Sequence, residues 1–246
     1  MRWFRRRPAA DAENVDDGRA TRAAALYGQF VSPGSLVFDV GANVGERTAV
    51  LVELGARVVA VEPQAKCAAM LRERFGEAVT VEQAAVGSAE GEAELHVASA
   101  HTISSLNPVW VERVQDSGHF SEYRWDETVG VPVTTLDALI ERYGVPDFVK
   151  VDVEGYELEV VRGLSRPVPV LSFEFDFELI EQRLSAVDRL AQLGMQTFNF
   201  SAGETLELEL DEWVGAEAIK TYLERTPRDV LFFGDVYARS ASLPRG

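Results

Sequence analysis

The chain is poor in the residues that build disulfide frameworks and membrane spans. It has one cysteine, Cys67, which excludes an intramolecular disulfide and a cysteine-rich zinc site. This composition fits a reducing compartment, so we expect a cytoplasmic protein. No apolar run is long enough to span a bilayer, and we expect no membrane span.

Positive charge is also scarce. The 246 residues hold 24 lysines and arginines against 40 aspartates and glutamates, a formal net charge of −16. Such a surface repels a phosphate backbone, so we expect no nucleic-acid partner. The basic residues 1–8 have no apolar stretch behind them and do not form a secretory signal. We expect residues 1–20 to be a disordered tail; the alternative is a weak surface anchor of arginine and aromatic side chains.

Hydrophobic residues make up 46% of the chain, enough for one α/β domain with a core of its own. Short apolar runs alternate with helical patterns of about three turns. This alternation predicts a mostly parallel sheet with helices on both faces, and the closely spaced late strands predict an antiparallel edge. We expect the domain to cover residues 21–238, with 239–246 as a loose tail.

The apolar runs and the turn residues between them give the predicted elements. A capping box at Thr134–Asp137 predicts the start of a helix there. The stretch 99–130 has no clean period, so we expect an irregular lid or acceptor-binding insertion; an ordinary surface loop is the alternative. Predicted strands cover 36–40, 57–61, 79–82, 92–97, 148–153, 168–175, 196–200, 206–210 and 230–233.

The most informative stretch runs from Val37 to Gly45, where an apolar run meets Asp39 and enters a glycine turn before a helix. A strand that leads into such a turn presents a ligand at the edge of a parallel sheet. Glu62 closes the next apolar run, and its carboxylate can accept both hydroxyls of a ribose. Together these residues predict a nucleoside site, although Asp39 alone is explained by a turn and Glu62 alone by a helix cap.

The glycine spacing separates two nucleoside cofactors. A Gly-x-Gly-x-x-Gly turn that starts at Gly41 needs glycines at the places of Asn43 and Glu46, so NAD is disfavoured. An NAD-dependent oxidoreductase is kept as an alternative. S-adenosylmethionine has no phosphate: its carboxylate suits a helix N-terminus, and its cationic groups suit oxygen atoms such as those of Asp39.

We expect the adenine of this donor to lie past the third strand. There Gln83 can pair with the exocyclic amine, and small alanines leave room for the ring. The predicted donor-binding residues are Asp39, Gly41, Ala42, Asn43, Gly45, Glu62, Pro63, Gln83, Ala84 and Asp152.

Acidic residues follow two later strands, Asp152 and Glu154 after one and Glu174 and Asp176 at the end of the next. Ligands of open α/β sheets bind at these carboxyl ends, so the acids are expected to share one crevice. They can hold the donor's ammonium group, accept a proton from an acceptor hydroxyl, or bind Mg²⁺.

We name Asp152, Glu154 and Glu174 as catalytic candidates, and Asp152 with Glu174 as a candidate metal pair. Helix capping is the alternative for Glu154 and Asp176. As bases, His101 and His119 rank below Asp152.

Several stretches resemble the FkbM-type methyltransferases: Phe38–Gly45, Val61–Pro63, Ser104–Leu106, Thr134–Asp137, Lys150–Glu157 and Leu171–Glu174. The resemblance implies a class I, Rossmann-like α/β fold, for which we expect a mostly parallel seven-stranded sheet. It implies S-adenosylmethionine-dependent O-methylation of a hydroxyl on a small molecule, sugar or glycolipid. By position it assigns Asp39, Gly41, Asn43, Gly45 and Glu62 to the donor, with Asp152 beside it. A catalytically silent donor-binding module is a further alternative.

Overall fold

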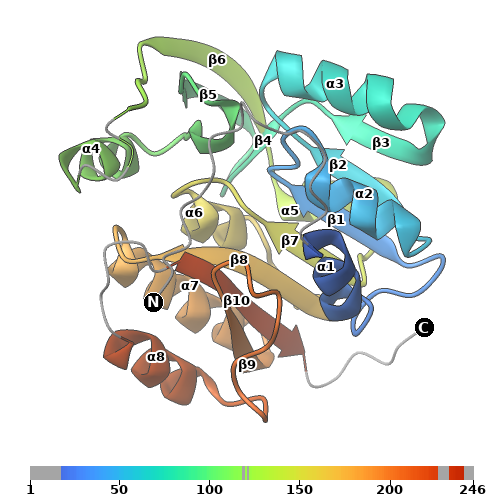
Figure 1. Ribbon diagram of the computed structural model, residues 1–246, viewed down its shortest axis with the longest axis vertical. Helices are drawn as coiled ribbons and strands as arrows, with labels where there is room; N and C mark the ends of the chain where they lie inside the picture. The colour runs from blue at the N-terminus through green and yellow to red at the C-terminus, as the bar shows by residue number, and fades with distance from the viewer. Residues whose placement is uncertain (1–17, 118–119, 121, 227–232, 241–246) are drawn as a thin grey trace.

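The computed structural model describes residues 18–117, 120, 122–226 and 233–240 (Figure 1). Its main sheet has seven strands in the order β3-β2-β1-β7-β8-β10-β9. These strands are β1 (Leu36–Val40), β2 (Arg57–Val61), β3 (Val79–Glu82), β7 (Phe148–Val151), β8 (Val170–Asp176), β9 (Met195–Ala202) and β10 (Phe233–Ser240). Strand β10 pairs antiparallel with both β8 and β9, and the other pairs of neighbouring strands are parallel. The predicted parallel sheet is confirmed, and its antiparallel strand lies one place in from the edge strand β9.

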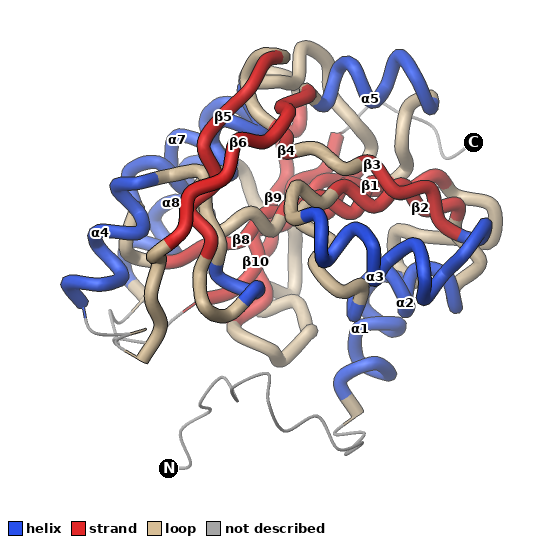
Figure 2. Tube along the Cα trace, turned by 90° about the horizontal axis from the view of Figure 1, so that it is seen from above, coloured by secondary structure: helices blue, strands red, loops and turns tan. Residues whose placement is uncertain are grey.

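Helices cover both faces of this sheet (Figure 2). One face carries α1 (Arg19–Tyr27), α2 (Glu46–Glu53) and α3 (Ala65–Phe75), followed by the short 3₁₀ turn η1 (Gly76–Ala78). The other carries α5 (Leu136–Tyr143), α6 (Glu157–Arg162), α7 (Ile180–Gln192) and α8 (Ala216–Arg225). In β1, for example, Val37 joins the core under α1 and Phe38 the core under α5, so the strand is apolar on both sides. None of the helices within the described ranges could cross a membrane by length and hydrophobicity.

The segment 99–130 is more ordered than expected. It contains the 3₁₀ turn η2 (His101–Ile103), helix α4 (Pro108–Ser117) and the start of strand β6 (Glu127–Thr134). Strand β6 pairs with β4 (Ala85–Val86) and β5 (Gly91–Val97) in a second, three-stranded sheet. Trp110 and Val114 of α4 pack with Ile103 in a small hydrophobic cluster of their own. Gly130 and Pro132 interrupt the strand pattern in the sequence, which is why β6 was not predicted there.

The structure also differs from several of the predicted elements in detail. The cap of α5 is Thr135, whose hydroxyl accepts from the amide of Ala138, and not Thr134. Strand β7 ends at Val151, before the left-handed Glu154 (φ +52°). Residues 206–210 form no strand, because the side chain of Asn199 bonds both main-chain groups of Leu210. Strand β10 continues to Ser240, two residues past the expected end of the domain, and the predicted strand at 230–233 falls largely outside the described residues.

Candidate functional site

The glycine turn after β1 is tied to both neighbouring strands. The amide of Gly41 donates to the carbonyl of Val61 at 2.9 Å, and the amide of Asp152 donates to the carbonyl of Val40 at 2.9 Å. Gly41 has φ +80°, and a Cβ there would lie 1.8 Å from the carbonyl oxygen of Asp152. Gly45 has φ +83°, and a Cβ there would lie 2.5 Å from the ring of Phe75. Both glycines therefore let the turn lie directly against β7 and α3.

Glu62 points into this turn from the end of β2. Its Oε2 accepts from the amide of Asn43 at 2.9 Å, and its Oε1 accepts from the amide of Gln64 at 2.8 Å. The residue is only 3% exposed, and burial raises the pKa of its carboxyl to about 6. Glu62 thus connects the glycine turn to the segment that follows β2.

The turn η2 lies over Glu62. The carbonyl of His101 accepts from the side-chain amides of Asn43 at 3.1 Å and Gln64 at 2.9 Å. The hydroxyl of Ser104 bonds the Gln64 amide oxygen at 3.3 Å. His101 therefore meets the turn through its main chain, and burial lowers the pKa of its ring. The sequence analysis did not identify Gln64. Its position two residues after Glu62, a predicted ligand residue, is the signal that could have indicated it.

Asp39 lies inside the fold. It is 1% exposed and accepts from the hydroxyl of Thr48, on α2, at 2.6 Å. Burial raises the pKa of Asp39, and nearby Lys150 partly offsets that rise. The carboxylate of Asp39 therefore anchors α2 beneath the turn.

Lys150 is a buried cation beside Asp39 that sequence reasoning did not single out. Its Nζ lies 2.9 Å from Oδ2 of Asp152. Burial alone lowers the pKa of Lys150, but the charges of Asp152 and Asp39 raise it above its ordinary value. A lysine between two valines of a buried strand is the signal that could have revealed it, because a buried charge needs a partner.

Three of the four predicted acids come together at the carboxyl ends of β7 and β8. One carboxylate oxygen from each of Asp152, Glu154 and Glu174 lies within 4.8 Å of the others. Asp176 has a different place: it accepts from the indole of Trp110 at 3.1 Å and pairs with Arg183 at 2.7 Å. Burial raises the pKa of Asp176 to about 6.

The remaining predicted site residues differ in their exposure. Gln83 is exposed, and its amide oxygen accepts from Arg72 at 3.3 Å. Ala42 and Ala84 are buried and Pro63 is half-buried. His119 lies outside the described residues.

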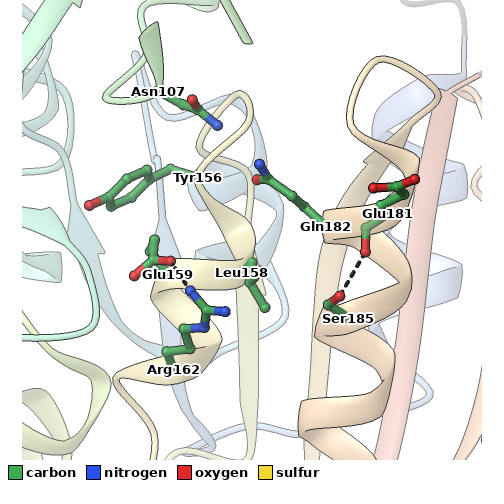
Figure 3. A pocket seen from close by; sticks show the side chains of 8 residues that line it. All are labelled: Asn107, Tyr156, Leu158, Glu159, Arg162, Glu181, Gln182 and Ser185. Atoms are coloured by element: carbon green, nitrogen blue, oxygen red, sulfur yellow. Dashed lines mark hydrogen bonds and ion pairs between the residues drawn. The ribbon is translucent and has the colours of Figure 1, made fainter. Parts of the chain in front are cut away.

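A groove of about 520 Å³ runs between α6 and α7 (Figure 3). Arg162 in this groove bonds Glu159 of its own helix. The groove contains no residue of the glycine turn or of the acid cluster, and it is lined by Asn107, Tyr156, Leu158, Glu159, Arg162, Glu181, Gln182 and Ser185.

The family model for the methyltransferase FkbM domain matches residues 39–206, more than half of the chain. The chain belongs to this family. The membership confirms the predicted methyltransferase and its Rossmann-like fold, supports S-adenosylmethionine as the donor, and decides against the NAD-dependent alternative. No curated protein matches the chain.

Similar solved structures include three methyltransferases. Precorrin-6y C5,15-methyltransferase from Geobacter metallireducens is 10% identical, with a TM-score of 0.47 over 96% of this chain and 94% of that one. The 1,6-didemethyltoxoflavin-N1-methyltransferase of Burkholderia thailandensis, solved with S-adenosylhomocysteine, is 16% identical, with a TM-score of 0.43 over 92% and 80%. An O-methyltransferase of Thermotoga maritima is 11% identical, with a TM-score of 0.44 over 94% and 68%.

Proposed function

We propose that this methyltransferase transfers the methyl group of S-adenosylmethionine to a hydroxyl oxygen of a small molecule, a sugar or a glycolipid. The observation that carries the proposal is the cluster of Asp152, Glu154 and Glu174 at the carboxyl ends of β7 and β8. A hydroxyl loses its proton when its oxygen is methylated, and a carboxylate within hydrogen-bond reach can take that proton. These strand ends are also where open α/β sheets bind ligands.

The groups around the glycine turn suit the donor. Helix α2 begins at Gly45 with no side-chain cap, so its first N–H groups can bind the donor's carboxylate. Each oxygen of Glu62 has a lone pair beyond its main-chain bond, with which it can accept a ribose hydroxyl. Because η2 covers Glu62, donor binding would displace the His101 carbonyl from Asn43 and Gln64.

The adenine and the methionyl end would lie on either side of this turn. We place adenine over Ala84. Gln83 can bond it there once the hydrogen bond between Arg72 and the amide oxygen of Gln83 is broken. Asp152 lies against Gly41, on the side of the turn where we place the donor's methionyl end. Asp39 supports the donor indirectly, since its carboxylate holds Thr48 and so fixes the start of α2.

When bound, S-adenosylmethionine supplies an already activated methyl group. The protein then has to hold the acceptor oxygen in line with that group and remove a proton. We assign the proton-accepting role to Asp152, whose side chain is 35% exposed, and orienting roles to the buried Glu154 and Glu174. The ammonium of Lys150, 2.9 Å from Oδ2 of Asp152, helps to fix the direction of this carboxylate.

Two measurements test the proposal. Calorimetry should show saturable binding of S-adenosylhomocysteine that Glu62→Ala weakens. A screen of hydroxyl compounds for release of S-adenosylhomocysteine should yield a product that Asp152→Asn slows, while Asp211→Asn, at an exposed position, leaves turnover unchanged. Absence of donor binding contradicts the proposal as a whole. Transfer to amines alone contradicts the hydroxyl assignment, and binding without transfer to any compound supports the silent binding module.

A divalent cation is a second use for the acid cluster. Mg²⁺ takes oxygen ligands and lowers the pKa of a bound hydroxyl, and we assign it to Asp152 and Glu174 if it is used. Turnover that is unchanged after EDTA treatment removes the metal from the proposal. Turnover that is lost with EDTA and restored by Mg²⁺ supports it.

A further inference from the structure

The loop that carries Asp152 and Glu154 is held from its inner side by one buried carboxylate. Oε1 of Glu157 accepts from the amides of Val153 at 3.3 Å and Gly155 at 3.2 Å. Glu157 is completely buried, and its other oxygen pairs with the guanidinium of Arg183 on α7. The conformation of the loop therefore depends on the carboxylate of Glu157, which lies outside the loop.

The insertion holds the same loop from its outer side. The hydroxyl of Ser105 donates to the carbonyl of Glu154 at 2.5 Å, and the side-chain amide of Asn107 donates to the carbonyl of Gly155 at 2.7 Å. The ring of Trp110 lies against Gly155, where a Cβ would come within 2.4 Å of it. Gly155 also has φ +97°, so this position requires glycine for two reasons.

The inner and outer contacts meet at Asp176. Its Oδ2 accepts from the indole N–H of Trp110 at 3.1 Å and lies 2.7 Å from Nη2 of Arg183. A closed ring of contacts therefore runs from Gly155 through Glu157, Arg183, Asp176 and Trp110 back to Gly155. Arg183 is 1% exposed, and it is the member that joins two carboxylates.

We propose that Arg183 is a positioning residue, which fixes the Asp152–Gly155 loop against the insertion through Glu157 and Asp176. This inference rests on the proposed function, because the loop matters for binding only if Asp152 contacts the donor. The planar fork of arginine reaches two carboxylates at once, whereas a lysine ammonium is a single point of charge. The conservative change to lysine therefore keeps the charge and loses one of the two contacts.

The variants Arg183→Lys, Arg183→Met and Trp110→Phe test this role in the full chain. The last keeps an aromatic ring at this position and removes the N–H that donates to Asp176, so it serves if Arg183→Met does not fold. Arg189→Lys is the matched control, since Arg189 lies on the same helix and bonds only the carbonyl of Leu164 among the bonds described. Each variant is titrated with S-adenosylhomocysteine by calorimetry, well below its own unfolding temperature.

We expect S-adenosylhomocysteine to bind Arg183→Lys about tenfold more weakly than wild type, and Arg183→Met more weakly still. The amide NMR signals of Val153 and Gly155 should move in Arg183→Lys and Trp110→Phe and stay in place in Arg189→Lys. A purely structural role would lower the unfolding temperature and leave the affinity of the folded protein unchanged. Wild-type affinity and unmoved signals in folded Arg183→Lys would overturn the inference. If wild type itself binds no S-adenosylhomocysteine, the proposed function fails instead, and the NMR comparison still decides the role of Arg183.

Discussion

Removal of the buried charge of Lys150 should destabilise the protein in a way that depends on pH. The side chain is 4% exposed and lies 2.9 Å from Asp152. In the register of β1 with β7, Lys150 also lies opposite Asp39, which is 1% exposed. Lys150→Met keeps most of the volume and removes the positive charge that β7 contributes there, which is the charge that lowers the pKa of Asp39 most.

The size of the effect follows from the burial of the two acids. Removing one partner of a buried ion pair costs about 3–5 kcal/mol. Since the side chain of Asp152 is 35% exposed, water screens part of that loss, and we expect about 2–4 kcal/mol for Lys150→Met at pH 8. Lys150 also offsets the rise in pKa that burial causes at Asp235, so Asp39, Asp152 and Asp235 share the loss.

The sign of the pH dependence follows from Asp39. Burial raises its pKa in the folded protein above the unfolded value, so the folded state binds the proton more tightly and loses stability as pH rises and Asp39 ionises. Without Lys150 this pKa rises further. A pKa difference of one unit corresponds to about 1.4 kcal/mol. We therefore expect the loss in free energy of unfolding of Lys150→Met to be smaller at pH 5.5 than at pH 8 by about 1–2 kcal/mol.

Urea denaturation followed by tryptophan fluorescence measures both quantities. Lys220→Met is the matched control, because Lys220 pairs with Asp188 and Glu217 at the surface, where side chains are 47% and 89% exposed. Its loss should stay below about 1 kcal/mol at both pH values. A deficit for Lys150→Met below that of the control, or one that is equal at pH 5.5 and pH 8, would refute the electrostatic reasoning.

Three further predictions concern the turn, the donor and the cap of α5. Gly41→Ala should lose about 2–5 kcal/mol in urea denaturation, whereas Gly34→Ala, also at positive φ but with open space around it, should lose only the conformational cost of about 1–2 kcal/mol; equal losses would contradict the contact with Asp152. Because the pKa of Glu62 is about 6 and the ionised form accepts hydroxyls, calorimetric affinity for S-adenosylhomocysteine should fall on acidification through pH 6 in wild type and stay flat in Glu62→Gln. Thr135→Ala should lower the free energy of unfolding by about 1 kcal/mol and Thr134→Ala by less, and the reverse order would restore Thr134 as the cap.

Much of the fold could be predicted because its signals are local. The bounds of β1, β2 and β3 match the prediction residue for residue, since each is a short run with at least two valines that begins two or three residues after a glycine. Glu154 could not be placed in the same way. Its left-handed backbone depends on Ser105 and Glu157, which no strand period reveals, yet this geometry still brings it close to Asp152 and Glu174.

Arg183 shows a second limit of pattern reasoning. The apolar period in the sequence of α7 runs through Leu184 and Val187, whereas the buried side of the helix also contains Arg183. Any hydropathy pattern assigns a charged residue to solvent. The carboxylates of Glu157 and Asp176, which come from α6 and β8, offset the cost of burying Arg183. Networks of this kind are therefore the part of a site that sequence reasoning finds last.

The glycine turn shows why fold and site are hard to separate in this chain. We assigned Gly41 to the donor because of its spacing, but its environment gives a packing reason: a Cβ would occupy the place of the Asp152 carbonyl oxygen. That same contact brings the turn against the end of β7, and so brings the proposed donor site next to the proposed base. If Gly41→Ala folds and the separation between turn and loop grows, donor affinity and turnover should fall together, because the absence of a Cβ at Gly41 allows the two halves of the site to lie against each other.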